Sequence, residues 1–147
     1  MYNDVDRVYP AIAVAIFNEN HEILLQKRKD LNQWGLISGH IEIGETVKEA
    51  VIREVKEETG LIVNITRMIG VYSDPTSQII HYPNGKTTHF ITNYFEAEII
   101  GGKLRIDESE SVDIRFFKPN ELPDNLLTMD PSWLEDALDK KGCGVFR

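Results

Sequence analysis

Apolar and polar positions along the chain predict a succession of strands interrupted by one well-marked helix. Residues 8–18 are rich in Val, Ile and aromatic side chains, which predicts a strand buried on both faces. A polar turn separates them from a second apolar stretch at residues 22–27, so these two segments are expected to form a hairpin. Residues 61–72 approach strict apolar–polar alternation, and residues 87–100 are the longest strand candidate.

The segment that follows residue 45 has the pattern of a helix. Thr46 and Glu49 can form a capping box, and Gly60 stands where a helix commonly ends. A second helix is predicted over residues 130–142, because Asp130 precedes a proline and Gly142 can terminate it. Residues 76–86 are expected to be irregular. The order of strands, helix, strands and helix predicts an α/β protein with a mixed sheet between helices.

The apolar face of the first helix becomes acidic towards its C-terminal end. At about 100° per residue, Glu54 and Glu58 project onto the apolar face and Glu57 lies at its edge. Neighbouring carboxylates repel one another, and a helix C-terminus carries partial negative charge. Arg53 is expected to neutralise only one carboxylate, so a hard divalent cation such as Mg²⁺ or Mn²⁺ would complete the cluster. Taken alone, however, a Glu57-Glu58 pair is more typical of a solvated surface.

The spacing around these glutamates is more specific than the glutamates themselves. Gly39 is followed after five residues by Glu45, and after seven more by the segment 53–61, REVKEETGL. This arrangement resembles the Nudix box, G-x5-E-x7-R-E-U-x-E-E-x-G-U with U aliphatic, and fills each of its fixed positions. At about 7% usage per residue type, seven fixed identities coincide by chance in roughly one window in 10⁸.

The resemblance implies a fold and a reaction. Residues 1–147 would form a single domain with the α/β/α sandwich of Nudix proteins. The family hydrolyses a nucleoside diphosphate linked to another group, X, which gives a nucleoside monophosphate and a phosphorylated X. The expected substrate is a nucleotide sugar such as ADP-ribose or a (d)NTP, including oxidised dNTPs. A non-catalytic nucleotide-binding regulatory module is the alternative.

The resemblance also implies roles for the residues of the box. Glu54, Glu57 and Glu58 would bind the Mg²⁺ cofactor, with Mn²⁺ as a substitute, and the carbonyl of Gly39 could approach the same cation. Glu54 and Glu57 carry the catalytic expectation together with Arg53, which would orient the metal-binding carboxylates through an ion pair with Glu45. That orientation is the cofactor-binding role expected for Glu45.

Residues outside the box are harder to assign. The general base is either a glutamate of the helix or a loop carboxylate, for which Glu110 is the candidate and Glu108 the substitute. His40 is interpreted as a plain loop residue, since imidazole suits Mg²⁺ less well than oxygen. The base or X group would stack on aromatic residues such as Tyr72 or Phe90, with Tyr82 a further choice, although each of these also fits a core or strand position.

Composition restricts the partners of the chain. A formal net charge of −8 argues against binding to nucleic acid polymers or anionic membranes, which requires a basic patch. The one cysteine, Cys143, can form no internal disulfide, which favours a reducing, cytoplasmic location. No segment has the length of a membrane span. The expected partner is therefore a small nucleotide substrate, with a homodimer possible.

Overall fold

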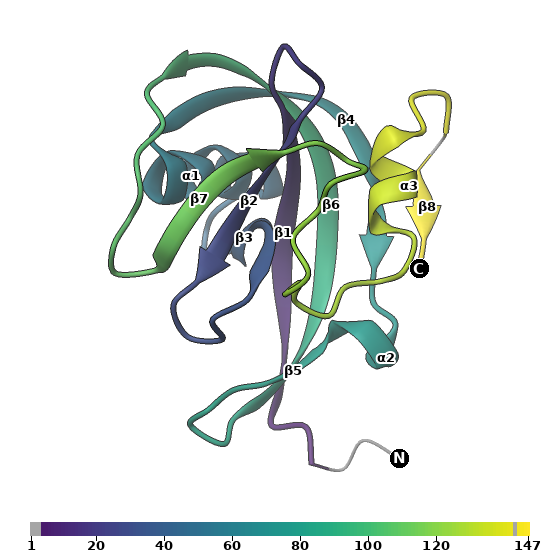
Figure 1. Ribbon diagram of the computed structural model, residues 1–147. Coiled ribbons are helices and arrows are strands. Elements are labelled where there is room, and N and C mark those ends of the chain that lie inside the picture. The colour runs from purple at the N-terminus through teal and green to yellow at the C-terminus, as the bar shows by residue number, and fades with distance from the viewer. Residues whose placement is uncertain (1–3, 143) are drawn as a thin grey trace.

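The computed structural model describes residues 4–142 and 144–147 as an eight-stranded mixed sheet with three short helices (Figure 1). The expectation about Cys143 falls outside the described residues. The strands are β1 (Arg7–Phe17), β2 (Ile23–Arg28), β3 (Trp34–His40), β4 (Leu61–Tyr72), β5 (Ile79–His81), β6 (Thr87–Gly102), β7 (Ser111–Phe117) and β8 (Val145–Phe146). The helices are α1 (Val47–Thr59), α2 (Pro75–Gln78) and α3 (Trp133–Leu138).

The strands run in the order β7-β2-β3-β1-β6-β4-β8, and β5 pairs beside this path with β6. β1 pairs in parallel with β6 from Arg7–Thr88 to Phe17–Glu98, whereas β3 pairs antiparallel with both β1 and β2. The predicted hairpin of β1 and β2 is confirmed at Phe17 and Ile23, but β3 separates the two strands beyond that point. The predicted mixed sheet is confirmed.

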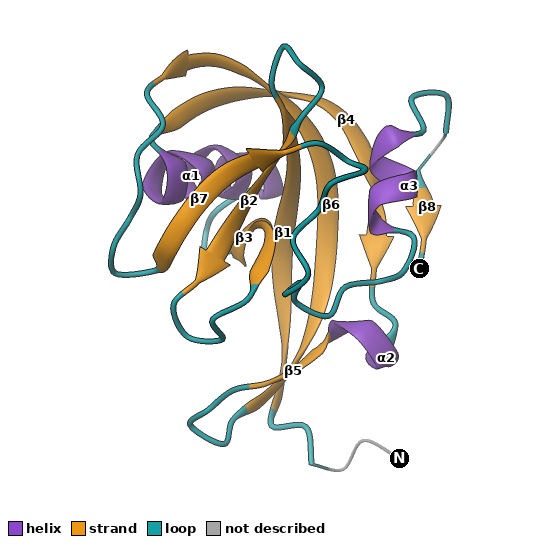
Figure 2. Cartoon of the chain, in the orientation of Figure 1, coloured by secondary structure: helices purple, strands orange, loops and turns teal. Residues whose placement is uncertain are grey.

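The sheet is covered on both faces, which Figure 2 shows with α1 on one side and α3 on the other. Successive residues of β1 point to opposite faces, so Ile12, Val14 and Ile16 pack in the core beneath α1, while Ala13 and Ala15 belong to the core beneath α3. This arrangement explains why β1 is apolar at nearly every central position. It also confirms the α/β/α class.

Local signals determine α1. Thr46 and Glu49 form the capping box, and Gly60 ends the helix in the left-handed conformation with φ 75°. The buried positions of the helix include Ala50, Val51 and Val55. The helix therefore begins and ends where the sequence predicts, and its C-terminal turn is anchored beside the sheet.

Three features differ from the expectations. β3 carries no periodic signal, because its four buried residues are followed by Ser38 and Gly39, and it becomes a strand through pairing on both sides. Residues 76–86 are not wholly irregular, since α2 and β5 occupy Pro75–His81. The C-terminal helix is shorter than 130–142, and none of the helices in the described ranges has the length and apolar character to cross a membrane.

Hydrogen bonds at both ends explain the shortened helix. The Asp130 side chain accepts from the Ser132 amide at 2.9 Å, and the Asp130 carbonyl accepts from the Trp133 amide, which forms a turn before α3. At the other end the Asp139 side chain accepts from the Lys141 amide at 3.2 Å. Such local bonds compete with helix continuation.

Candidate active site

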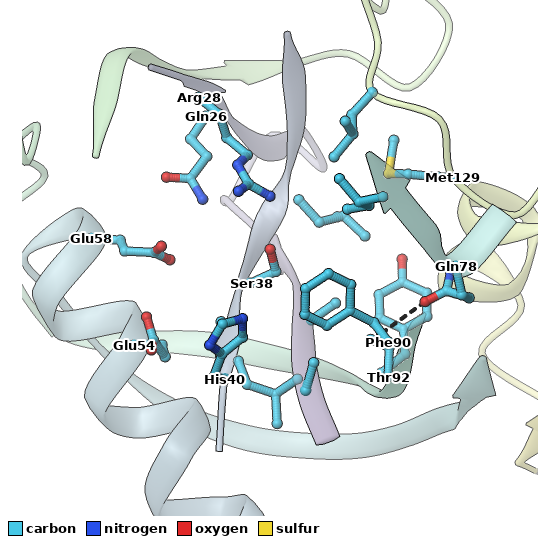
Figure 3. Close-up of a pocket in the computed structure, with 18 of the residues that line it drawn as sticks. Gln26, Arg28, Ser38, His40, Glu54, Glu58, Gln78, Phe90, Thr92 and Met129 are labelled. Atoms are coloured by element: carbon cyan, nitrogen blue, oxygen red, sulfur yellow. Dashed lines mark hydrogen bonds between the residues drawn. The ribbon is translucent and has the colours of Figure 1, made fainter. Parts of the chain in front are cut away.

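A cleft of about 610 Å³ runs from the C-terminal half of α1 across β3 to the segment that precedes α3. Figure 3 shows Glu54 and Glu58 at one end, Ser38 and His40 in the middle, and Phe90 and Met129 towards the other end. The predicted residues Gly39, Arg53, Glu57 and Glu110 also line it. Residues far apart in the sequence therefore share one cavity.

Arg53 contacts four carboxylates at the acidic end of the cleft. It forms a bidentate pair with Glu45, at 2.6 and 2.9 Å, and its Nη1 lies 2.9 Å from Glu54 and 3.2 Å from Glu57. Glu42 lies at 3.6 Å. Its planar fork reaches the loop on one side and the helix on the other. The single positive charge of Arg53 still balances only one of these carboxylates, as expected from the sequence, so the cluster keeps a net negative charge.

These contacts also set the charge of Glu45. Its hydrogen bonds to Arg53 lower the pKa of the Glu45 carboxyl to about 2, with a smaller effect from the Glu42 backbone. Arg53 Nη2 additionally donates to the carbonyl of His40 at 3.0 Å. The guanidinium thus contacts the end of β3, the loop between β3 and α1, and one face of α1.

Glu58 is the most buried of the predicted carboxylates, at 8% exposure. Burial, followed by repulsion from Glu54, raises the pKa of Glu58 well above its usual range. Its Oε2 is buried without a hydrogen-bond partner among the residues described. An unpaired buried carboxylate oxygen is costly, so this atom is suited to a ligand that enters the cleft.

Gly39 is required by the position of Glu54. A Cβ atom at residue 39 would lie 2.2 Å from Glu54 Cδ and 2.5 to 2.6 Å from both carboxylate oxygens. The strand and the helix therefore approach each other at this point as closely as a glycine permits. Burial raises the pKa of Glu54, and the hydrogen bond from Arg53 opposes that effect.

Of the two loop candidates, Glu110 lines the cleft and Glu108 is not among its lining residues. Glu110 is close enough to Glu58 for its charge to raise the Glu58 pKa. Its backbone carbonyl accepts from the Lys29 amide at 2.9 Å, which fixes the loop against the end of β2. The loop therefore contributes two acidic residues to the cleft lining, Asp107 and Glu110.

Sequence reasoning missed two residues on β2. Gln26 is buried, its Oε1 accepts from the Ser111 hydroxyl at 2.7 Å, and a hydrogen bond from its side chain lowers the pKa of Glu58. Arg28 lines the cleft, pairs with Asp30 at 2.7 Å and lowers the Glu58 pKa by its charge. Their position beside Glu58 depends on strand pairing, which leaves no local mark in the sequence.

All three aromatic candidates line the cleft, but their surroundings differ. Tyr72 is buried and donates to Asp136, and Tyr82 lies beneath the Arg28 guanidinium, 6.0 Å from ring centroid to Cζ. Phe90 lines the cleft and stacks on His40, with ring centroids 5.4 Å apart. His40 ends β3, so its interpretation as a plain loop residue is wrong.

The donor set fits a hard divalent cation, since it offers carboxylates and an unpartnered buried oxygen on Glu58. Glu54 and Glu57 are directed at Arg53. Consequently no three His, Cys, Asp or Glu side chains in residues 4–142 and 144–147 already surround a common metal position. An ion here would use Glu58 together with carboxylates drawn from the Arg53 network.

Comparison with known proteins decides the family. The model of the NUDIX domain matches residues 8–139. The chain belongs to the NUDIX family. An ADP-ribose pyrophosphatase of Methanocaldococcus jannaschii is 41% identical over 120 aligned residues, and the match covers 79% of this chain and 66% of that protein. The NAD-capped RNA hydrolase NudC of Vibrio atlanticus is 37% identical over 80% of this chain and 40% of its own length.

Solved NUDIX structures agree with the fold. A crystal structure of an ADP-ribose pyrophosphatase from Streptococcus suis has a TM-score of 0.73 and 26% identity, and the match covers 95% of this chain and 98% of that one. The two curated NUDIX relatives are longer than the matched region, since the chain spans 66% and 40% of them. The predicted family and fold are confirmed.

Proposed function

We propose that this NUDIX protein is a divalent-metal-dependent pyrophosphohydrolase that cleaves a nucleoside diphosphate linked to X. The observation that carries the proposal is the buried, partnerless oxygen of Glu58, which faces a cleft shared with Glu54, Glu57 and Arg53. A structural carboxylate would not be left in this state, because an unsatisfied buried acceptor is unfavourable.

Glu54, Glu57 and Glu58 would hold Mg²⁺, with Mn²⁺ as a substitute, and Gly39, whose carbonyl could approach the same cation, lines the cleft next to Glu54. When bound, the cation supplies charge neutralisation for the phosphates and acidifies water. Arg53 keeps the carboxylates in position through the ion pair with Glu45. The net charge of −8 makes such neutralisation necessary for any phosphate substrate.

In the reaction a water oxygen forms a new bond to phosphorus while the anhydride P–O bond breaks. We assign the acceptance of that water's proton to Glu110, and its place in the cleft lining supports this role. The electron pair of the broken bond leaves with the departing phosphate. The products are a nucleoside monophosphate and a phosphorylated X, or pyrophosphate when the substrate is a nucleoside triphosphate.

The substrate class follows from the same cleft and from the relatives. The cleft of about 610 Å³ is large enough for a nucleotide with an attached group. A similar protein carries the name ADP-ribose pyrophosphatase. We therefore rank ADP-ribose and related nucleotide sugars before (d)NTPs.

The test is hydrolysis of a panel of ADP-ribose, other nucleotide sugars, dNTPs and 8-oxo-dGTP with Mg²⁺ or Mn²⁺, with products identified by mass. Glu57→Gln and Glu58→Gln should each reduce turnover at least about 100-fold. Glu135→Gln, an exposed glutamate of α3 outside the cleft lining, should have no effect. Nucleotide binding without turnover of any member would instead identify a regulatory module.

A further inference from the structure

The half of the cleft that lies beyond His40 has no role in the reaction at the phosphates. It is lined by apolar and aromatic side chains, among them Phe90, Met129 and Trp133. Figure 3 places the Phe90 ring between His40 and Met129, with Gln78 and Thr92 beside it. This apolar half is built from segments 72–94 and 127–133, which lie outside the Nudix box.

A stack of rings supports this half. The Phe90 ring packs on His40, and His40 packs on Tyr9 with centroids 4.9 Å apart and an interplanar angle of 14°. The Arg7 guanidinium covers the Tyr9 ring at 4.9 Å. Because the His40 carbonyl is also bonded to Arg53, the stack connects the apolar half rigidly to the acidic end. Rigid aromatic surfaces of this kind suit a planar ligand.

Most polar groups of the apolar half are already engaged. The Tyr94 hydroxyl donates to the Trp133 carbonyl at 3.0 Å, and the Tyr72 hydroxyl donates to Asp136. The Thr92 hydroxyl donates to Gln78 Oε1 at 2.8 Å, which leaves the Gln78 amide nitrogen available as a donor. A ligand would therefore meet few free polar groups here.

Asp130 is the second polar residue of the apolar half, after Gln78, that can form a hydrogen bond to a ligand. It lines the cleft and is 7% exposed, and its Oδ1 accepts from the Ser132 amide at 2.9 Å. Within residues 4–142 and 144–147, Asp130 belongs to none of the ion pairs, in contrast to Asp136, which pairs with Arg147 at 2.8 Å. A buried carboxylate retains acceptor capacity beyond one hydrogen bond, so Asp130 can accept from a ligand.

We propose that the apolar half binds the purine base of the substrate, with Phe90 beneath the ring, Asp130 accepting from an amino or imino group and Gln78 donating to a ring acceptor. This inference rests on the proposed function, because that function is the reason to expect a nucleotide in the cleft. A carboxylate at Asp130 disfavours phosphates in this half, whereas Arg28 lies towards the other end (Figure 3) and Arg53 pairs with Glu54 there. A purine matches because its edge combines donors with acceptors next to a flat apolar face.

The experiment is calorimetric binding of AMP, GMP, purine riboside 5′-monophosphate and ribose 5-phosphate. Purine riboside monophosphate lacks the amino and imino donors, and ribose 5-phosphate lacks the base. Asp130→Asn preserves an oxygen for the Ser132 amide but places an NH₂ group where the second oxygen stood. Asp139→Asn is the matched control, because Asp139 makes the same local bond to a backbone amide but is exposed outside the cleft lining.

The tighter of AMP and GMP should bind at least tenfold more strongly than purine riboside monophosphate. Asp130→Asn should remove that difference and leave ribose 5-phosphate binding unchanged, while Asp139→Asn should bind like the wild type. Gln78→Met should weaken the same purine nucleotide severalfold, which tests the pocket independently of the turn before α3.

Three results would overturn the proposal: equal affinity for AMP, GMP and ribose 5-phosphate, no detectable nucleotide binding, or unchanged selectivity in a folded Asp130→Asn protein. Purine-selective binding without hydrolysis would overturn the proposed reaction but support this pocket. Hydrolysis with unchanged selectivity in Asp130→Asn would support the reaction and overturn the pocket.

Discussion

At the scale of single residues, the acidic end of the cleft depends on how closely β3 approaches α1. Any side chain at residue 39 would overlap the Glu54 carboxylate, and glycine avoids this clash. Arg53 then holds that carboxylate from the other side. Glu54 is therefore confined between a glycine and a guanidinium, and small changes at either should be visible in catalysis.

Gly39→Ala should reduce kcat/KM on the order of 100-fold, because the added Cβ displaces the Glu54 carboxylate. The displaced atoms are the end of a flexible side chain, so the melting temperature should fall by no more than a few degrees. Gly101→Ala is the control, since its Cβ would meet ordinary contacts at 3.8 Å. Wild-type activity in Gly39→Ala would show that the position of Glu54 is unimportant.

At the scale of elements, a helix or strand can be predicted from the sequence when the contacts that stabilise it are local in the chain. α1 was predictable because its capping box and its terminal glycine lie within the element itself. β3, α2 and β5 were not, because pairing with β1, β2 and β6 stabilises the strands and the Asp74 cap stabilises a single helical turn. Glu54, Glu57 and Glu58 share α1 and were predicted together, whereas Gln78 and Asp130 come from segments without periodic signals.

The end of α1 should be sensitive to substitution. In Gly60→Ala the Cβ would lie 2.4 Å from the Lys103 carbonyl oxygen at φ +75°, so we expect a loss of about 2 to 4 kcal/mol in the free energy of unfolding. Gly85→Ala shares the positive φ, at +85°, but meets nothing within 4 Å, and should lose only about 1 kcal/mol. Equal losses in urea titrations would indicate that the Lys103 contact is absent.

At the scale of the whole molecule, the C-terminal residues hold the α3 side of the sheet. Arg147 pairs with Asp136 at 2.8 Å, and its backbone bonds to Val71 and Ser73 place β8 against β4. Asp136 in turn accepts from Tyr72, which lines the cleft. Arg147 therefore supports the apolar half through Asp136 and Tyr72.

Arg147→Gln should lower the melting temperature at pH 7 by several degrees. Hydrogen bonding to Arg147 holds the pKa of Asp136 below its ordinary value of 3.8. The ion pair therefore stabilises the fold above that pH and is lost as the pH falls below it. The difference between wild type and variant should shrink between pH 5 and pH 2.5.

Arg115→Gln is the control for that comparison, because Arg115 pairs with Asp113 at the surface, where it is 65% exposed. Exposed pairs contribute little to stability, so this variant should melt like the wild type at every pH. A constant difference across the pH range for Arg147→Gln would show that the effect comes from packing rather than charge.

The parallel pairing of β1 with β6 has a consequence for the order in which the molecule can form. The Nudix box is complete by residue 61, yet its helix packs on a β1 strand that must wait for residues 88–98 as a parallel partner. Asp130 and the Arg147 contact come later still. During synthesis the chain would therefore carry the whole Nudix box well before it had a cleft, and a nascent fragment ending near residue 100 should bind no nucleotide.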